Sequence, residues 1–599
     1  MSSMSIPRWS VFIACALVTL GCYLFQMGVL VPHLAETVPT HVGEVIGRVS
    51  SLWPSFIPRD NREEARAITL PFSVMLAVLF GAYGVALWAV AGRSSRLAEF
   101  AVFGMGTVYS ALLATSPVML ANDVYSYAAY GRMYALNHVD PAVVLTPLPA
   151  GDPYTKLWGE FLPPSSYGPA WTLISAGVAL LAATKIGLTV LLYRAVAVLA
   201  VLVTTILIAI CARRFAPERT AQGMLFFMWN PLVILESAMS GHNDAVMICF
   251  FLAGIALHLY GRGFLALVLF SLSVLIKFAT APLIPIYVVM VLRQLPNWRA
   301  RSAFLAQAAA AGALTLAAMV VFAESGSQPR KVELVRKDKA PLLGWWVFQQ
   351  RYTNSPHELL YRALRICMGE EPDDVRDVEF WGWWIKTLRA TALRSTATGD
   401  GELVERIKRG TPLLVTQPRS QEIWLRVYNP ETGKKGYVLE ENTDAIDRPA
   451  IAERDPELVR WEMGTSPTAV RADLVLKTAS WAAFGLAWLA ALAYARDLRR
   501  FLLAATSLFL ASYWLVSTTF YAWYVIWALA LAVLVPMSAP ALLTVLLSAS
   551  SLIIYAATGY DDPRDSMEWV FIYRSVLIFG LPLLLFPAAY GVKRALRIN

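Results

Sequence analysis

The chain has 599 residues, of which 57% are hydrophobic and only 16% are charged. A soluble protein of this length needs a far more charged surface, and apolar runs of about 17 or more residues recur, so the composition predicts a polytopic helical membrane protein. The net charge of +9 does not indicate nucleic-acid binding, because much of it lies in short loops, where Lys and Arg orient membrane helices. Five scattered cysteines without a Cys-x-x-Cys pair give no sign of a disulfide framework or a zinc site.

The apolar segments predict an all-α fold with about 12–14 transmembrane helices, in an N-terminal region of residues 1–324 and a C-terminal region of residues 473–599. The expected spans, in chain order, are 9–31, 69–92, 98–120, 186–212, 219–239, 243–260, 303–323, 473–495, 500–518, 520–536, 539–558 and 568–590. The first lacks a small-residue cleavage site after it and is expected to be an uncleaved span. Segment 264–294 is interrupted by Lys277, Pro282 and Pro285, so it forms either one kinked span or a hairpin of two half-helices.

Basic clusters predict the orientation of these spans. Five loops carry such clusters and are assigned to the cytoplasm: Arg93/Arg96, Arg213/Arg214/Arg219, Arg293/Arg299/Arg301, Arg496/Arg499/Arg500 and Lys593/Arg594/Arg597. All five agree if 264–294 returns to its starting side and if 168–184 lies at the interface instead of crossing the membrane. Both termini would then be cytoplasmic.

Residues 325–470 interrupt the hydrophobic pattern and are expected to face outward. The stretch 325–400 is rich in tryptophan and predicts amphipathic interfacial helices; the tryptophans are Trp345, Trp346, Trp381, Trp383 and Trp384. The stretch 401–446 shows period-two alternation in 403–407, 412–415, 423–428 and 436–439, with a turn at 429–433, which predicts a small β-barrel followed by a linker, 447–472. This barrel resembles bacterial SH3-like domains, which often bind cell-wall peptides or carbohydrate. A structural cap without a ligand is an equally good interpretation.

Three polar segments are predicted to meet at the outer face. Asp123 follows the span that ends at Leu120, and an acidic residue costs about 2.5–3.5 kcal/mol at a helix centre and less near the interface. The segment 240–244 lies between two spans, and 518–524 lies at the outer end of a late span. Ionisable groups from distant regions of the chain would converge on one face, which is typical of an interfacial active site.

Five local motifs follow one another along the membrane portion, at about 100–290 and 505–590. They are Asn122-Asp123-Val124-Tyr125-Ser126-Tyr127-Ala128 with Gly131-Arg132 and Asp140-Pro141; Ser166-Tyr167-Gly168-Pro169-Ala170-Trp171; Trp229-Asn230-Pro231 with Glu236 and Gly241-His242-Asn243-Asp244; Lys277-Phe278 with Pro282 and Pro285; and Trp523-Tyr524-Val525-Ile526-Trp527. In this order they resemble the polyprenol-phosphate-dependent glycosyltransferases of the glycosyltransferase-C superfamily, especially bacterial mannosyltransferases. Two features depart from that family: no Asp-x-Asp surrounds Asp123, and the SH3-like insert is not typical.

The resemblance implies an integral membrane enzyme that moves a sugar, in the first place mannose, from polyprenyl phosphate to an extracytoplasmic glycan or lipid-linked acceptor, with inversion. It also implies a bacterial inner membrane. Asp123 would act as general base, a contribution of typically 10²–10⁴-fold. Residues expected to bind the donor phosphate or the sugar are Arg132, His242, Asn243, Asp244, Lys277, Tyr125, Tyr127, Tyr167, Trp523 and Tyr524. No cofactor is certain, and a divalent metal shared by Asp123 with Asp244 or Glu236 requires that the fold bring them close. Membrane lipids and a cell-wall or protein partner of the SH3-like domain complete the expected partners, without nucleic acid.

Each candidate also has a structural interpretation. Asp123 could make only a structural hydrogen bond, 242–244 could cap the following helix, and Lys277 could snorkel or pair with Glu236. Arg132 could be an interfacial anchor, Trp523-Tyr524 a segment of an aromatic belt, and Asn230-Pro231 a kink. The rival function is a transporter or flippase of lipid-linked sugars, which would place ionisable residues near the bilayer midplane within repeats.

Overall fold

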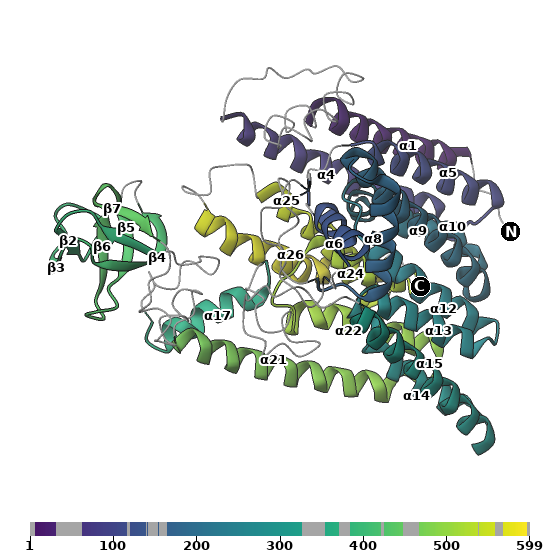
Figure 1. Ribbon diagram of the computed structural model, residues 1–599. Coiled ribbons are helices and arrows are strands. Elements are labelled where there is room, and N and C mark those ends of the chain that lie inside the picture. The colour runs from purple at the N-terminus through teal and green to yellow at the C-terminus, as the bar shows by residue number, and fades with distance from the viewer. Residues whose placement is uncertain are drawn as a thin grey trace.

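The protein is a bundle of helices with a small β-sheet that stands apart from them (Figure 1). The computed structural model describes residues 6–30, 63–116, 120–121, 123–138, 141, 152, 154, 165–325, 354–370, 384–420, 424–446, 467–536, 538–557 and 567–595. Several predicted features lie outside these residues: Asn122, Asp140, Trp345, Trp346, Trp381, Trp383, most of the expected linker 447–472, and 326–353 and 371–383 of the expected interfacial helices.

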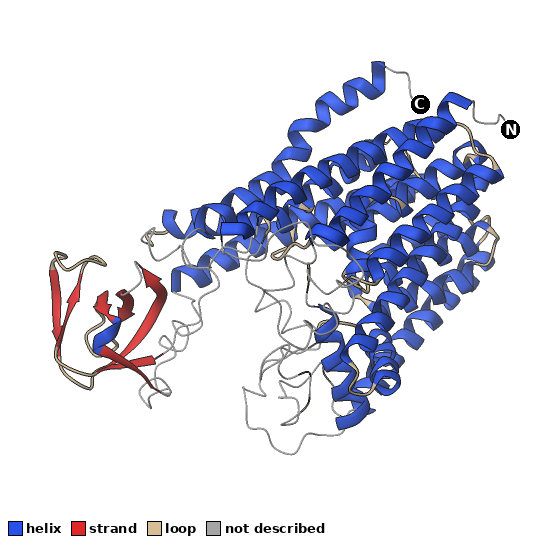
Figure 2. Ribbon diagram, turned by 90° about the horizontal axis from the view of Figure 1, so that it is seen from above, coloured by secondary structure: helices blue, strands red, loops and turns tan. Residues whose placement is uncertain are grey.

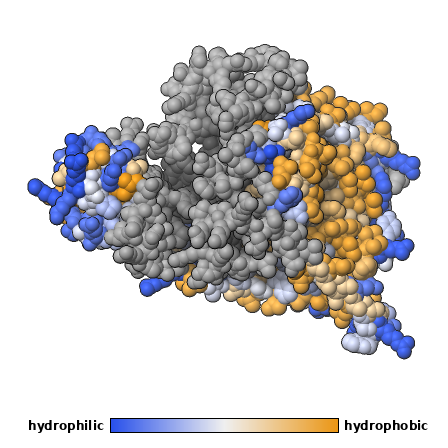
Figure 3. All heavy atoms as spheres, viewed as in Figure 1, coloured by the Kyte–Doolittle hydropathy of each residue, from blue (hydrophilic) through white to orange (hydrophobic). Residues whose placement is uncertain are grey.

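Seven helices among the described residues are long and apolar enough to cross a membrane, which confirms the all-α polytopic fold. They belong to α1 (Ile6–Phe25, continued by η1, Gln26–Leu30), α4 (Glu63–Val90), α5 (Arg96–Ala114), α9 (Ile186–Phe215), α15 (Trp298–Ser325), α21 (Pro467–Tyr494) and α26 (Met567–Ala595). Among them, α1 packs against α4 and α5, and α5 packs against α9. The helices together form a body that is separate from the strands (Figure 2). Hydrophobic side chains form a band across this body, whereas the surface of the sheet is largely hydrophilic (Figure 3).

The other expected spans are shorter or broken helices. They are α10 (Thr220–Met228), α11 (Pro231–Ile234), η4 (Leu235–Met239), α12 (Asp244–Leu259), α22 (Leu498–Leu515), η7 (Ala522–Tyr524), α23 (Val525–Ala532), α24 (Ala539–Ser551) and α25 (Ile553–Ala557). The break after α10 has a local cause: the Asn230 side chain accepts a hydrogen bond from the N–H of Leu232 at 3.0 Å, and Pro231 starts α11. The kink predicted at this Asn-Pro pair is therefore present.

Segment 264–294 is a hairpin of two half-helices, α13 (Gly263–Ile276) and α14 (Leu283–Gln294), joined through η5 (Phe278–Thr280). Lys277 ends α13 in extended conformation, with φ −155° and ψ 132°. The chain then folds back, so that the rings of Phe270 and Tyr287 lie 4.8 Å apart. Of the two arrangements that the sequence left open, the structure has the hairpin.

Two short helices pack against each other next to this hairpin. α6 (Asp123–Asn137) packs along α8 (Pro169–Ala182), which is the segment expected at the interface. α8 has 14 residues, and its N-terminus is tied to the hairpin because the N–H of Gly168 donates to the carbonyl of Ile276 at 3.0 Å. Gly168 fits this approach because it has no side chain: an added Cβ would lie 2.1 Å from the Leu275 carbonyl oxygen. The α6–α8 pair thereby fixes the end of α6, where Asp123 lies.

The seven-stranded antiparallel sheet has the order β3-β2-β6-β5-β4-β1-β7. Four expected strands are confirmed as β3 (Leu403–Ile407), β4 (Pro412–Ser420), β5 (Trp424–Tyr428) and β6 (Lys435–Leu439). The expected domain boundary at 401 is wrong, because β1 (Trp384–Thr387) and β2 (Thr391–Arg394) already belong to the sheet, which β7 (Thr443–Ile446) completes. The SH3-like assignment stays a prediction.

Between the membrane helices and the sheet lies α17 (Pro356–Cys367), a described segment of the expected interfacial region. Its buried face is mixed: His357, Glu358 and Arg365 are buried there, together with Tyr361, which packs on Ala472 and Leu476 of α21. The hydroxyl of Ser355, just before the helix, donates to the Thr518 carbonyl at 2.9 Å. This contact connects the insert to the aromatic segment 518–524.

Candidate active site at one end of the helix bundle

The three polar segments predicted to meet do lie together. Asp123 begins α6, residues 240–243 form the turn before α12, and Lys277 ends α13. Trp523 and Tyr524 form η7, after the end of α22. The contacts among these residues, given below, join segments that are hundreds of residues apart.

Asp123 lies where three neighbours converge on one carboxylate oxygen. Its Oδ2 accepts hydrogen bonds from the hydroxyls of Tyr167 at 3.2 Å and Tyr127 at 3.4 Å, and Nε2 of His242 is 3.7 Å away. The Asp123 side chain is 24% exposed, whereas that of His242 is fully buried. The carboxylate is therefore held by protein groups and is still open to a substrate.

The two tyrosines remain hydrogen-bond donors at neutral pH. Burial, reinforced by the charge of Asp123, raises the pKa of Tyr127 and of Tyr167 well above the usual value. The Tyr127 ring packs edge-on against Tyr167 and Trp171, with centroids 5.0 and 5.1 Å away. Both hydroxyls are thus fixed and protonated, and they orient Asp123.

His242 is held on three sides. Its Nδ1 lies 3.0 Å from the backbone carbonyl oxygen of Glu236 and 3.1 Å from the carboxylate Oε2 of the same residue. Its ring stacks on Trp523 with centroids 3.8 Å apart, and Trp523 in turn stacks on Tyr521 at 4.4 Å. Both faces of Trp523 are therefore covered by protein rings, and its expected role as a sugar platform is not what this geometry favours.

Asp244 and Lys277 form a buried ion pair, with 2.8 Å between Lys277 Nζ and Asp244 Oδ1. The same oxygen accepts a hydrogen bond from the indole N–H of Trp527. Lys277 also lies 4.8 Å from the ring centroid of Tyr524 and 5.2 Å from that of Trp527. The predicted alternative that Lys277 pairs with Glu236 is wrong, because Glu236 contacts His242 instead.

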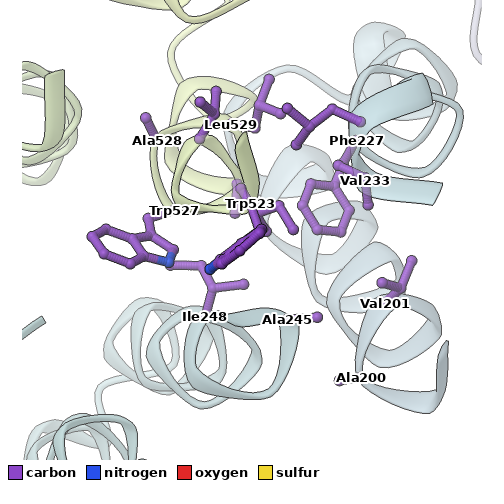
Figure 4. Close-up of a cluster of buried hydrophobic side chains, with 14 of the residues drawn as sticks. Ala200, Val201, Phe227, Val233, Ala245, Ile248, Trp523, Trp527, Ala528 and Leu529 are labelled. Atoms are coloured by element: carbon purple, nitrogen blue, oxygen red, sulfur yellow. The ribbon is translucent and has the colours of Figure 1, made fainter. Parts of the chain in front are cut away.

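Apolar packing fixes the indoles that serve this pair. Trp523 and Trp527 point from η7 and α23 towards Ala245 and Ile248 of α12 (Figure 4). On the other side of α23, Phe227 and Val233 close the cluster (Figure 4). A buried indole N–H needs a partner, and Asp244 supplies it. This shared apolar core holds α12 and α23 together and thereby fixes Trp527 relative to Asp244.

Asn243 occupies the N-cap position of α12, but its side chain makes no capping hydrogen bond. Among the described residues, neither amide atom of Asn243 has a hydrogen-bond partner, and the same holds for the hydroxyls of Ser237 and Ser240. All three side chains are buried. Each unsatisfied polar atom costs about 1–3 kcal/mol, so polar groups that lack protein partners here suit a ligand with hydroxyls.

Arg132 and Tyr125 are not brought to Asp123. Arg132 lies nine residues further along α6, which is about 13 Å at 1.5 Å per residue. Its Nε and Nη2 donate to Asp152 Oδ2 at 2.9 and 2.7 Å, and Nη1 donates to the Ala183 carbonyl at 2.6 Å. The guanidinium therefore links α6 to Asp152 and to the C-terminal end of α8. Tyr125 is buried within electrostatic reach of Arg194.

Two site residues were not predicted. The Glu236 carboxylate is fully buried against His242, and Tyr555 of α25 donates to Glu236 Oε1 at 2.8 Å. Glu236 was visible in the Trp-Asn-Pro…Glu motif, but it was considered only as a metal ligand shared with Asp123 or as a partner of Lys277. Tyr555 lies 319 residues away in sequence and has no signal in the pattern. Within the described ranges no group of three or more His, Cys, Asp and Glu side chains is arranged to hold a metal ion.

Comparison with known proteins gives matches in the N-terminal half. Residues 38–293 match the family of the alpha-(1->6)-mannopyranosyltransferase N-terminal domain. Alpha-(1->6)-mannopyranosyltransferase A of Mycobacterium tuberculosis is 27% identical over 249 residues, which are 39% of this chain and 46% of that protein. A second alpha-(1->6)-mannopyranosyltransferase of the same organism is 31% identical over 159 residues, 25% of this chain and 26% of that protein. No solved structure gives a significant match.

The chain thus spans less than half the length of the curated relatives that it matches. The matched region 38–293 contains Asp123, Tyr167, the 236–244 segment and Lys277, so the cluster lies within it except for the late aromatic residues and Tyr555. The resemblance to bacterial mannosyltransferases drawn from the motifs is therefore confirmed for residues 38–293, which are similar to the alpha-(1->6)-mannopyranosyltransferase N-terminal domain.

Proposed function

We propose that the protein is a membrane mannosyltransferase that uses a polyprenyl-phosphate donor. It transfers the mannosyl residue to a hydroxyl of an extracytoplasmic glycan or lipid-linked acceptor, with inversion at the anomeric carbon. The relatives are named as mannopyranosyltransferases, which supports mannose as the sugar, and the helical bundle supports a donor that reaches the site from the bilayer. Asp123 is the general base.

The observation that carries this proposal is the unequal exposure of the three carboxylates in the cluster. The side chains of Glu236 and Asp244 are fully buried, and each faces a cationic or ionisable partner. Asp123 alone among the three is open, at 24%, and is oriented by two tyrosine hydroxyls. A general base must lie within hydrogen-bond reach of the proton that it removes, and this carboxylate meets that condition.

The reaction then follows from the positions of the charges. The acceptor hydroxyl loses its proton to Oδ1 of Asp123, the oxygen that Tyr127 and Tyr167 do not contact, as its own oxygen attacks the anomeric carbon. The bond between that carbon and the phosphate oxygen breaks, and the electron pair leaves with the polyprenyl phosphate. Lys277 is 15% exposed, and its ammonium has donors beyond the one on Asp244, so it can stabilise the departing phosphate.

Polar atoms without partners among the described residues suit the sugar. The amide of Asn243 and the hydroxyls of Ser237 and Ser240 are donors and acceptors of the kind that sugar hydroxyls need, and because all three are buried, they would bind the sugar only after the turn 240–243 moves, whereas Glu236 and Asp244 keep their protein partners. Asp244 holds Lys277 in place and is shielded from the substrate. Arg132 has no role in this scheme, because Asp152 and Ala183 occupy its donors.

The test is a transfer assay with the full chain in lipid nanodiscs. Radiolabelled polyprenyl-phosphate mannose is supplied with candidate acceptors, and Asp123→Asn is compared with Asp497→Asn. Asp497 caps α22 through the N–H of Arg500, and an asparagine caps a helix equally well. We expect the first variant to lose about 10²–10⁴-fold in kcat and the second to transfer normally.

Full transfer by a folded Asp123→Asn protein would remove Asp123 as the base. The same labelled donor also tests the rival function, a transporter of lipid-linked sugars. If vesicles containing the protein move polyprenyl-phosphate mannose across the bilayer without consuming it, the protein is a transporter. The positions of Glu236 and Asp244 beside the turn 240–243, at the same end as Asp123, favour the enzyme, because a transporter would place such groups near the midplane.

A further inference from the structure

We infer that His242 takes the proton onward from Asp123, and that buried Glu236 is the positioning residue that makes His242 able to do so. This inference rests on the proposed function, in which Asp123 first removes the proton of the acceptor. It adds a second proton carrier and a second carboxylate, neither of which touches the substrate.

The hydrogen bonds of His242 determine which ring nitrogen carries the proton. Nδ1 faces the Glu236 carbonyl oxygen at 3.0 Å and the Glu236 carboxylate at 3.1 Å. A carbonyl oxygen and a carboxylate can only accept, so Nδ1 must be the protonated nitrogen. In the neutral ring the lone pair therefore lies on Nε2, which points towards Asp123 at 3.7 Å and has no other partner among the described residues.

The surroundings of the ring favour a cation. His242 and Glu236 are both completely buried, so the attraction between an imidazolium and this carboxylate is weakly screened. The Glu236 side chain is held from the other side by the Tyr555 hydroxyl at 2.8 Å. The charged and titratable groups that face or surround the ring are Glu236 of η4, Asp123 of α6, Asp244 of α12 with its partner Lys277, Tyr555 of α25, and the tyrosines Tyr127 and Tyr167.

The proton transfer balances without any further reactant. Once Asp123 has been protonated, its O–H donates to Nε2 of His242. The O–H bond breaks, an N–H bond forms, and the products are the Asp123 carboxylate and an imidazolium beside Glu236. The 3.7 Å separation must shorten by roughly 0.5–1 Å, and such contacts commonly tighten when substrate is bound. After product leaves, the proton returns through Asp123 to water.

The arrangement differs from a structural hydrogen bond in one measurable way. The backbone carbonyl of Glu236 fixes the Nδ1–H tautomer, whereas its side chain supplies only charge. A Glu236→Gln variant should therefore keep the tautomer and the Trp523 stack but lose the anion that favours the imidazolium. His242 should then be protonated only at lower pH.

The experiment uses the full chain in nanodiscs and compares Glu236→Gln with Glu236→Asp. The matched control is Glu99→Gln, which removes a carboxylate that pairs with Arg213 at the other end of the bundle. For Glu236→Gln we expect kcat to fall about 10- to 100-fold, with the KM for the donor unchanged and the acid limb of the pH–rate profile moved to lower pH. Glu236→Asp should largely restore the pH profile, and Glu99→Gln should resemble the wild type.

Nitrogen-15 NMR of histidine-labelled protein gives a readout that does not need turnover. The chain has six histidines, and the signal of His242 is identified by its loss in His242→Gln. The Nδ1–H tautomer should be present in wild type and in Glu236→Gln, with a titration at lower pH in the variant. If wild-type protein transfers no mannose, the proposed function fails, and the NMR titration still decides whether Glu236 and His242 are coupled.

Two results would overturn the inference. One is a Glu236→Gln protein with wild-type kcat and an unchanged acid limb. The other is a Glu236→Gln protein that loses kcat but has an unchanged pH profile and an altered tautomer, because this would show that Glu236 only keeps the turn folded.

Discussion

Substitution of Lys277 by methionine is expected to destabilise the protein far more than substitution of its partner Asp244 by asparagine. The two members of this ion pair differ in exposure: the Asp244 side chain is fully buried, whereas that of Lys277 is 15% exposed. Lys277→Met leaves an uncompensated carboxylate that, among the described side chains, keeps the hydrogen bond from the Trp527 N–H. Asp244→Asn leaves an ammonium that can reach water along the open side.

The magnitudes follow from this asymmetry. Removing one partner of a buried pair costs about 3–5 kcal/mol when the other charge stays buried, which is roughly two to three and a half orders of magnitude in the unfolding equilibrium. Asp244→Asn retains an acceptor for Trp527 and loses one charged hydrogen bond, about 1.5–3 kcal/mol. The double variant removes both charges, so it should be more stable than Lys277→Met alone.

The assay is unfolding of detergent-solubilised protein by denaturant, for wild type, both single variants and the double variant. The thermodynamic cycle gives the coupling energy of the pair. A Lys277→Met protein as stable as Asp244→Asn would refute the assignment of Asp244 as a buried anion that depends on Lys277.

Two further outcomes test how the site is held. Gly168→Ala should cost about 1–3 kcal/mol of stability and raise the KM for the donor, because its Cβ would lie 2.1 Å from the Leu275 carbonyl oxygen, two residues before Lys277. The control is Gly177→Ala in α8, whose Cβ meets nothing within 4 Å. Equal thermal stability of the two variants would contradict this packing. Excision of 384–446 with a short Gly-Ser closure should leave the rate of mannosyl transfer within about twofold of the wild type. The closure can be short because Trp384 pairs with Ile446, so the first and last residues of the excised segment lie side by side. Loss of transfer by a folded excision variant would instead assign the sheet a role in acceptor binding.

The sequence predicted the elements that depend on local pattern. Long apolar runs gave the spans, and the basic loops required the return of 264–294, which the structure has as a hairpin. The alternating segments of the insert became β3 to β6, and burial alternates with period two along β6. The expected convergence of Asp123, the 240–244 turn and the 518–524 segment also holds, since helix ends on one side of a bundle must meet there.

The partners within the site could not be predicted, because they depend on side-chain direction. The choice of Lys277 between Glu236 and Asp244 is decided by the turn at 240–243, where the chain changes direction by 116° and separates the two carboxylates. Arg132 resembles a phosphate ligand in the motif, but nine residues of α6 carry it to Asp152. Tyr555 reaches Glu236 only through tertiary packing across 319 residues.

The distribution of charge explains why one carboxylate of three is suited to be the base. A buried carboxylate with a fixed cation, such as Asp244, is neutralised by its partner and cannot take a proton from a substrate that does not reach it. Glu236 is equally shielded, but its partner is a histidine, whose charge can change near neutral pH. Asp123 lies between these two pairs and the open side. In the proposed reaction, the same burial that removes Glu236 and Asp244 from the substrate would let each control a neighbour: Glu236 would set the charge of His242 behind Asp123, and Asp244 would hold Lys277 for the departing phosphate.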